Sequence, residues 1–192
     1  MPKSTVKKRN SYDFMEYTRE TALERLLEGY KAYFNITLLE EEHKPLTAIC
    51  EFFEHSEKYV ISRQANLWKA DCEEFVYVFD VERLTREIYE KCRDQAYEDG
   101  MKRAHIGPGH MYTYITAVFL CDICDEDARK ALQKCRIYKS FRFSLHGWMD
   151  FHAAVLEVSE GNRITTNRSG RCVGEILKNV LSLNKRKRRK VL

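Results

Sequence analysis

Two uninterrupted runs of strand-forming residues constrain most strongly how this chain can fold. Residues 75–79 read FVYVF and residues 112–120 read YTYITAVFL. Such continuous runs are typical of strands that are covered on both faces. Between the runs, apolar residues recur at helical spacing and end at a glycine: Leu84, Ile88, Cys92, Ala96 and Gly100. A strand, a helix and a second strand in this order predict a parallel βαβ unit.

A second unit of the same kind is predicted to follow directly. Asp122 is the expected N-cap of a helix whose first turn is acidic and whose far end is basic. Residues 141–146 then alternate apolar and polar side chains, as a half-exposed strand does. Right-handed crossovers would make the strands at 75–79, 112–120 and 141–146 parallel.

The remaining segments flank this parallel centre. A helix is predicted from Ser11 to Phe34 because leucine and aromatic residues recur there at spacings of three and four. The other predicted elements are strands at 46–54 and 58–61, a hairpin turn at 147–150, strands at 151–158 and 163–166, and a helix capped by Ser169. We therefore expect an α+β fold: a mixed β-sheet with a central parallel βαβαβ segment, on which an N-terminal and a C-terminal helix pack.

The charge of the chain is concentrated at its two ends. The net charge is +4, but residues 1–10 and 185–190 are basic without any acid, so the body between them is acidic. We expect a single domain over residues 11–184 between a basic tail at 1–10 and another at 185–192. The C-terminal run is a candidate contact for RNA or another polyanion through Lys185, Arg186, Lys187, Arg188, Arg189 and Lys190. A tail that only aids solubility explains the same run equally well.

Composition also predicts where the protein is located. The first ten residues are polar and no apolar segment of a secretory signal follows. The longest apolar run, at 112–121, is much shorter than the roughly 18 residues of a transmembrane segment. Seven cysteines form an odd number scattered through apolar segments, which favours a reducing compartment. We expect a cytoplasmic protein.

The predicted parallel strands indicate where a ligand would bind. Open sheets with parallel strands usually bind ligands at the carboxyl ends of these strands. The residues that follow the three predicted strands are Asp80, Cys121, Cys124, His146, Trp148 and Asp150. This edge is the candidate ligand-binding site.

One C-x-x-C motif lies at this edge, at Cys121 and Cys124. At a junction of strand and helix it occupies a thioredoxin-like redox position, but the motif Trp-Cys-Gly-Pro-Cys is absent and the acids around it oppose a thiolate. Alternatively, Cys121 and Cys124 would bind a zinc ion together with His146, and Asp150 or Cys135 are further candidates for the remaining ligands. The third interpretation is that both thiols pack in the core. No other cofactor is predicted.

A second cluster lies between His146 and His152. In a continuous strand, His146, Trp148, Asp150 and His152 would share one face, where a histidine beside a carboxylate forms a general base. The alternative is a hairpin turn at 147–150, with His152 as a core histidine whose hydrogen bonds are satisfied. The turn is the favoured interpretation.

The stretch Met111-Tyr112-Thr113-Tyr114, together with residues 139–148, KSFRFSLHGW, resembles an uncharacterised family of bacterial cytoplasmic proteins, chiefly from anaerobic Gram-positive species. This resemblance implies no activity.

The leading hypothesis is a small cytosolic ligand-binding or regulatory domain. The alternatives are a metal-dependent or thiol-redox enzyme at the Cys121, Cys124 and His146 edge, and an RNA- or ribosome-associated protein that binds through its tails. The sequence alone does not decide whether the chain is an enzyme.

Overall fold

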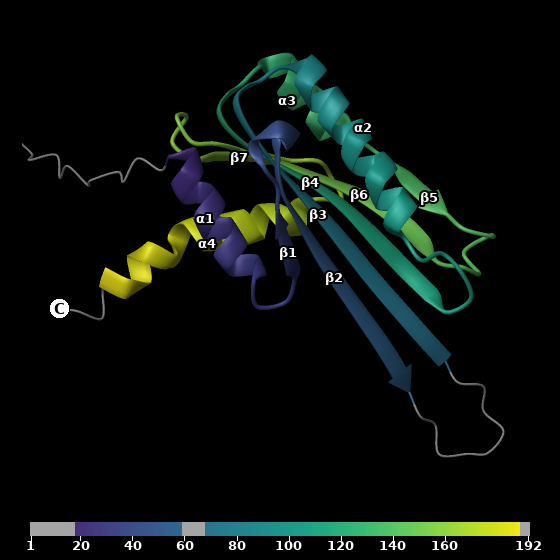
Figure 1. Ribbon diagram of the computed structural model, residues 1–192. Helices are drawn as coiled ribbons and strands as arrows, with labels where there is room; N and C mark the ends of the chain where they lie inside the picture. The colour runs from purple at the N-terminus through teal and green to yellow at the C-terminus, as the bar shows by residue number, and fades with distance from the viewer. Residues whose placement is uncertain (1–17, 59–67, 189–192) are drawn as a thin grey trace, which may run out of the picture.

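A seven-stranded mixed sheet forms the centre of the protein, with strand order β1-β2-β3-β4-β6-β5 and with β7 also paired to β6. The computed structural model describes the backbone of residues 18–58 and 68–188 and the side chains of residues 18–54 and 71–180 (Figure 1). The strands are β1 (Asn35–Leu38), β2 (Leu46–Lys58), β3 (Trp68–Leu84), β4 (His110–Cys124), β5 (Tyr138–Ser140), β6 (Trp148–Glu157) and β7 (Arg163–Thr166). The helices are α1 (Arg19–Tyr30), α2 (Arg86–Arg103), α3 (Glu126–Lys134) and α4 (Arg171–Arg188), with a short 3₁₀ helix η1 (Glu41–His43).

The central strands are parallel, as the two apolar runs predict. β3 pairs with β4 and β4 pairs with β6 in parallel, whereas β1, β2, β5 and β7 pair antiparallel to their neighbours. The α+β class with a parallel centre is therefore confirmed. The third parallel strand is β6, so the predicted parallel strand at 141–146 and the predicted turn at 147–150 are both wrong.

Residues 141–147 form a turn because their backbone leaves the strand conformation. Arg142, Phe143 and Ser144 have φ angles of 51°, 55° and 65°, in the left-handed region that non-glycine residues seldom adopt. The turn closes through hydrogen bonds between Phe141 and residues 146 and 147. Phe143 is 98% exposed and Leu145 is 76% exposed, so their alternation with polar residues does not reflect burial.

Gly147 ends this turn and cannot be exchanged for a larger residue without movement of the backbone. Its φ angle is 68°, and a Cβ atom at this position would lie 2.2 Å from the carbonyl oxygen of Met111. The chain therefore turns tightly against the start of β4 and enters β6 at Trp148. This close approach sets the register of the two strands, in which Tyr112 pairs with Trp148.

The helix ends also differ from the predicted ones. α1 begins after Thr18, whose hydroxyl accepts the Thr21 N–H at 3.2 Å, and it ends at Tyr30 rather than Phe34; Ser11 lies outside the described residues. α3 is capped at Asp125 rather than Asp122, because β4 continues to Cys124. The predicted strands at 46–54 and 58–61 are one strand as far as Lys58, and residues 59–61 are outside the described part.

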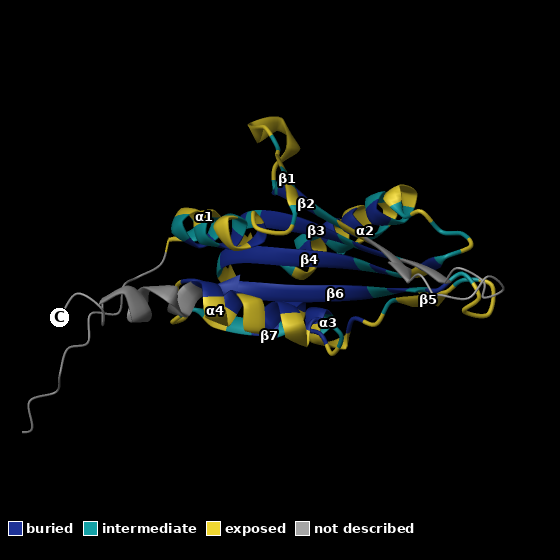
Figure 2. Ribbon diagram, turned by 90° about the horizontal axis from the view of Figure 1, so that it is seen from below, coloured by how far each residue is buried: buried dark blue, intermediate teal, exposed yellow. Residues whose placement is uncertain are grey.

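Each face of the sheet is covered by two helices. α2 and α3 pack on one face with the side chains of Phe75, Phe119 and Phe151, and α1 and α4 pack on the other with those of Val78 and Leu156. In Figure 2, α1 and α4 lie together at one end of β4 and β6, and the strands change from buried to intermediate toward the other end. Among the described residues, no helix has the length and apolar character needed to cross a membrane.

A single side chain fills the gap between the two short strands that pair with β6. Asn167, which is 1% exposed, exchanges backbone and side-chain hydrogen bonds with Ala153, each 3.0 Å long. Its amide nitrogen donates to the carbonyl oxygens of Phe151 at 2.9 Å and Cys135 at 3.2 Å. Its side-chain oxygen also accepts the Gly170 N–H at 2.7 Å. The amide thus continues the hydrogen-bond ladder from β5 to β7.

Candidate functional site

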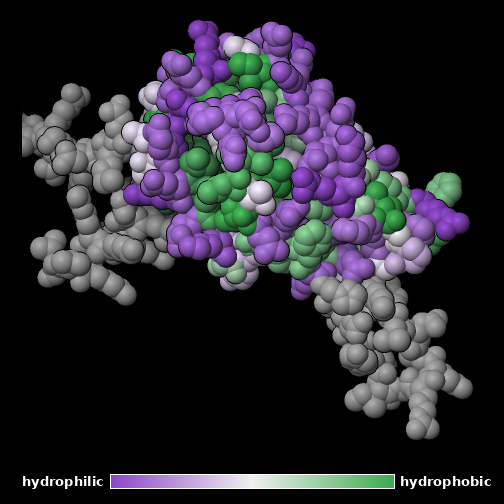
Figure 3. Space-filling view, in the orientation of Figure 1, coloured by the Kyte–Doolittle hydropathy of each residue, from purple (hydrophilic) through white to green (hydrophobic). Residues whose placement is uncertain are grey.

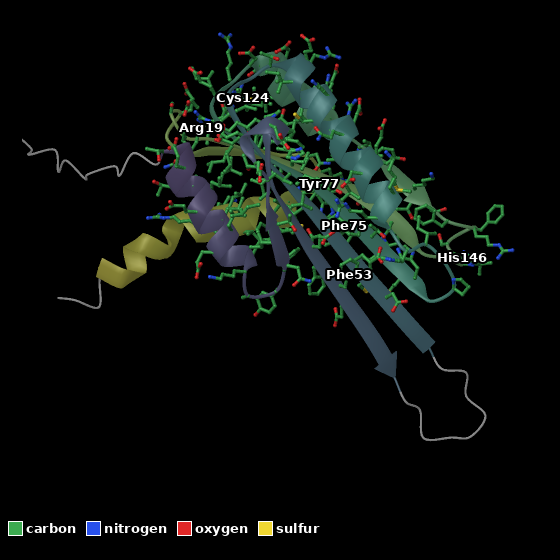
Figure 4. All side chains as sticks on the ribbon, viewed as in Figure 1. Arg19, Phe53, Phe75, Tyr77, Cys124 and His146 are labelled. Carbon is green, nitrogen blue, oxygen red and sulfur yellow. The ribbon has the colours of Figure 1, made fainter. Side chains whose placement is uncertain are left out.

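The residues of the predicted ligand-binding edge are divided between the two ends of the sheet. Trp148 pairs with Tyr112 near the start of β4, whereas Cys121 and Cys124 lie at its other end. Figure 4 shows Cys124 and His146 at opposite ends of the strands. The prediction that these residues share one edge of the sheet is therefore wrong, because the third parallel strand begins at Trp148 instead of ending near it.

Asp80, near the carboxyl end of β3, forms an ion pair. Arg19, the first residue of α1, binds Asp80 through Nη1 and Asp122 through Nε at 3.0 Å. Asp80 and Asp122 lie on neighbouring strands, and both side chains are largely shielded from solvent. This arrangement holds the start of α1 against the sheet.

The same end of the other face contains a buried ion pair. Glu157 is fully buried, and its carboxylate accepts from Arg129 Nη2 at 2.7 Å and from Arg129 Nε at 3.2 Å. The Cys124 N–H also donates to Glu157 at 3.3 Å, and Arg129 donates to the Cys124 carbonyl oxygen at 2.8 Å. The chain around the C-x-x-C motif is thereby fixed by the pair.

The two thiols of the motif lie in the core. Cys121 is 0% exposed and Cys124 is 4% exposed. Burial raises the pKa of the Cys124 thiol to about 11 and raises that of Cys121 further above its ordinary range. Since the thiolate is the reactive and metal-binding form, these environments favour inert thiols. His146 is not near them, and within the described residues no three groups of the metal-ligating type come together.

Three aromatic rings lie in a row on the opposite half of the sheet, on the face that α1 and α4 cover only in part. We call Tyr112, Tyr114 and Trp148 the aromatic platform. The centroids of Tyr112 and Tyr114 are 4.5 Å apart with their planes inclined by 28°, and those of Tyr112 and Trp148 are 6.0 Å apart. All three side chains are partly exposed. The platform follows from register, because even-numbered residues of β4 and β6 point to this face.

Polar groups adjoin the platform on the same face. Asp150 and His152 follow Trp148 at alternate positions of β6, as the less favoured interpretation of this segment predicts. His152 is 4% exposed and its Nδ1 has no hydrogen-bond partner, so it is not the satisfied core histidine of the favoured interpretation. Its ring centroid lies 4.6 Å from that of Tyr114. Burial lowers the pKa of His152, which favours the neutral imidazole.

Glu74 supplies a second acid to this face. It lies on β3 beside Tyr114 of the platform and accepts a hydrogen bond of 3.0 Å from the Thr116 hydroxyl. Burial raises the pKa of the Glu74 carboxyl, and the Thr116 hydrogen bond opposes this shift. The Tyr30 hydroxyl, on α1, is buried without a hydrogen-bond partner among the described residues. Burial raises the pKa of Tyr30, and the charge of Glu74 adds to this shift.

A chain of polar side chains crosses the other face at the same end. The Nδ1 atom of His110 donates to the carbonyl oxygen of His146 at 2.7 Å, and Nε2 lies 2.7 Å from the Thr113 hydroxyl. Thr113 in turn contacts Glu73 at 3.2 Å, and Glu73 accepts from His105 Nδ1 at 2.8 Å. The chain ties the turn at 141–147 to β3 and β4.

The described residues also line a groove of about 700 Å³ between β2, η1 and α2. Its apolar floor includes Leu39, Leu46, Ile49 and Tyr77. Figure 3 shows apolar side chains gathered near β1, beside this region. The Asp99 carboxylate accepts from Tyr77 at 2.7 Å and from Arg103 at 2.6 Å. The polar groups of the groove are thus paired or exposed to solvent, in contrast to those of the platform.

Sequence reasoning missed Glu74, Tyr112 and Tyr114. The alternation of Tyr112 and Tyr114 indicates a shared face, and an acid directly before the apolar run at 75–79 is unusual enough to draw notice. The side chains of residues 185–190 lie outside the described part, although the backbone of α4 continues to Arg188. A polyanion contact through this run remains an expectation.

A family described as Domain of unknown function (DUF8052) matches residues 18–179, which contain both ends of the sheet and the aromatic platform. No curated protein matches the chain. No solved structure matches it either.

Proposed function

The chain belongs to the family described as Domain of unknown function (DUF8052), and we propose that its domain binds a small molecule on the aromatic platform. The observation that carries this proposal is His152, a buried histidine that has an unpartnered ring nitrogen and lies against Tyr114. An unpaired buried polar atom costs about 1–3 kcal/mol. Such a cost is expected beside a functional site. Because Nδ1 is itself enclosed, a ligand on the adjoining rings would contact it only after a movement of side chains.

The surroundings of the platform support this function. Ligand sites combine a largely apolar surface with a few convergent polar groups. Here Tyr112, Tyr114 and Trp148 provide the apolar surface, and Glu74 and Asp150 provide carboxylates at its border. The α1 and α4 helices pack on the same face nearer the other end of the strands, so within the described residues they leave the platform partly exposed.

We favour binding over catalysis because the two cysteines of the C-x-x-C motif lie elsewhere. Cys121 and Cys124 are buried at the other end of β4, where burial raises the pKa of both thiols. His152 and Asp150 lie two positions apart on one face of β6, but no hydrogen bond joins their side chains among the described residues, so Asp150 does not orient the imidazole. We therefore assign a regulatory or sensing role and no reaction.

Location and source form a further part of the proposal. All seven cysteines are free, and this supports a reducing compartment such as the cytoplasm. A bacterial origin is supported by the resemblance noted for residues 111–114 and 139–148. Fractionation of cells that express the full chain tests the location.

A thermal-shift screen of small metabolites against the full chain tests the binding function. Ligands that raise the melting temperature are then titrated by calorimetry against Trp148→Leu and Tyr114→Leu. We expect both variants to lose at least about tenfold in affinity, because an aromatic contact is worth about 1–3 kcal/mol.

Tyr33→Leu is the matched control for this screen. Tyr33 is 76% exposed and lies just before β1, an edge strand that β2 and β3 separate from the platform strands β4 and β6, so its replacement should leave the affinity unchanged. If Lys91→Ala in the groove abolishes binding while the platform variants retain it, the ligand site is the groove and the proposal fails.

A further inference from the structure

Two acids adjoin the aromatic platform. Burial is the largest cause of the raised pKa values of Tyr114 and Cys172, and the charges of Glu74 and Asp150 add to both shifts. Within the described residues, neither of these acids forms an ion pair with a lysine or arginine. The carboxyl end of the sheet differs, since arginines pair with Asp80, Asp122 and Glu157 there. The platform therefore carries acids that the described chain does not neutralise.

Glu74 is the least expected of these acids. Its carboxylate is partly buried on β3, and the hydroxyl of Thr116 is its hydrogen-bond donor. A carboxylate withdrawn from water is costly unless a cation pairs with it, and no ion pair to Glu74 or Asp150 occurs in the part of the chain that the structure describes. Acids in such positions are retained where a function requires them.

The aromatic rings add attraction for the same kind of charge. The face of a tyrosine or tryptophan ring attracts a cation through the ring quadrupole. The centroids of Tyr112 and Tyr114 are 4.5 Å apart in a stacked arrangement, and that of Trp148 is 6.0 Å from Tyr112, so a cation reaches only the ring faces that the stack leaves uncovered. Tyr114 lies between Glu74 on β3 and Asp150 on β6. Two acids therefore flank the aromatic surface across the width of three strands.

We propose that the ligand of this site is an organic cation, an amine or ammonium group carried on an apolar or aromatic body. This inference rests on the proposed binding function. The cationic group lies between Glu74 and Asp150, and the apolar body stacks on the platform. Of the four buried polar atoms that have no partner among the described residues, two lie on this face, Nδ1 of His152 and the hydroxyl of Tyr30. The other two, in Tyr89 and Asn162, lie elsewhere.

Three small aromatic probes that differ in charge test this assignment. Calorimetric titration of the full chain with phenethylamine, 2-phenylethanol and phenylacetate compares a cation, a neutral molecule and an anion of similar size. Phenethylamine should bind at least about tenfold more tightly than 2-phenylethanol. Phenylacetate should bind most weakly, and added salt should reduce the preference for the cation.

Two variants remove the charge without removing the shape. Glu74→Gln keeps an acceptor for the Thr116 hydroxyl, and Asp150→Asn is its counterpart on β6. Each should abolish most of the preference for phenethylamine over 2-phenylethanol. Glu87→Gln is the matched control, because Glu87 is an exposed acid on α2, across the sheet, and this variant should keep the full preference.

The outcomes separate the ligand class from the function itself. If 2-phenylethanol or phenylacetate binds as tightly as phenethylamine and Trp148→Leu abolishes this binding, the cation assignment is overturned while the binding function stands. If none of the three probes binds, the cation assignment is again overturned, and the metabolite screen decides the function. If phenethylamine binds equally well to Glu74→Gln and Asp150→Asn, the acids do not select the ligand.

Discussion

Replacement of Arg129 by methionine is expected to destabilise the domain by about 3–5 kcal/mol, the usual cost of leaving one member of a buried ion pair without its partner. Glu157 is fully buried, and Arg129 supplies two of its hydrogen bonds, at 2.7 Å and 3.2 Å. Arg163 does not replace Arg129, because its Nε is 3.9 Å away and its side chain is half exposed. For a chain of this length the loss corresponds to a fall in melting temperature of about 6–20 °C.

Urea unfolding followed by circular dichroism measures this loss. The double variant Arg129→Met with Glu157→Leu should regain most of the stability, because an apolar pair of similar volume often replaces a buried ion pair without loss. Arg83→Met is the control, since the Arg83–Asp125 pair at 2.9 Å has an arginine that is 66% exposed and exposed pairs contribute about 0–1 kcal/mol. A loss for Arg129→Met no larger than that for Arg83→Met would refute the reasoning.

Four further predictions follow from single residues. Gly147→Ala should destabilise the domain by more than about 1 kcal/mol, because the added Cβ would meet a backbone oxygen at 2.2 Å; an unchanged urea midpoint would contradict this. Cys172 is the exposed cysteine, so it should be the first to react with a thiol reagent added to the folded protein at pH 8. Cys172→Ser should remove this fast phase of the reaction, and rapid reaction of the buried thiols would show that the core opens. Burial lowers the pKa of His152 from its ordinary value of 6.5, so the unfolded chain binds a proton more readily than the folded chain. The free energy of unfolding should therefore fall as the pH drops below about 6.5. His152→Phe should reduce this pH dependence, and an unchanged pH dependence would mean that other groups cause it. Burial raises the pKa of Glu74 from its ordinary value of 4.5, so the stability that the protonated side chain contributes is lost as the pH rises through the folded-state pKa. Glu74→Gln should therefore raise the melting temperature at pH 7 and not at pH 4. Destabilisation by this variant at pH 7 would mean that the carboxylate has a partner in the native protein.

The parallel centre of the fold could be predicted from the sequence because strands that are buried on both faces consist of uninterrupted apolar residues. The runs at 75–79 and 112–120 lie in β3 and β4, and the helix between them packs on these strands. The ends of the elements could not be predicted as well. β4 continues to Cys124 because its backbone keeps pairing with β3 as far as Leu84, and nothing local to the C-x-x-C motif indicates this pairing.

The third parallel strand was misplaced for a different physical reason. The alternating residues at 141–146 have the period of a strand, but Arg142, Phe143 and Ser144 adopt positive φ angles, which only tertiary contacts can impose on such residues. The predicted site depended on the position of that strand, so its residues lie at two ends of the sheet instead of at one. Trp148 and Asp150 remain in the site, whereas Glu74 and Tyr114 join it only through the register of three strands.

Asn167 has a consequence for how the sequences of related chains can vary. Its side chain acts as a substitute peptide group, with an oxygen that accepts from Ala153 and Gly170 and a nitrogen that donates to Phe151 and Cys135. Aspartate has the same shape but no N–H to donate, and glutamine places its amide one carbon further from the backbone. Only asparagine meets both requirements. We therefore expect this residue to be a signature of chains that complete the edge of their sheet with two short strands, even where the aromatic platform has diverged.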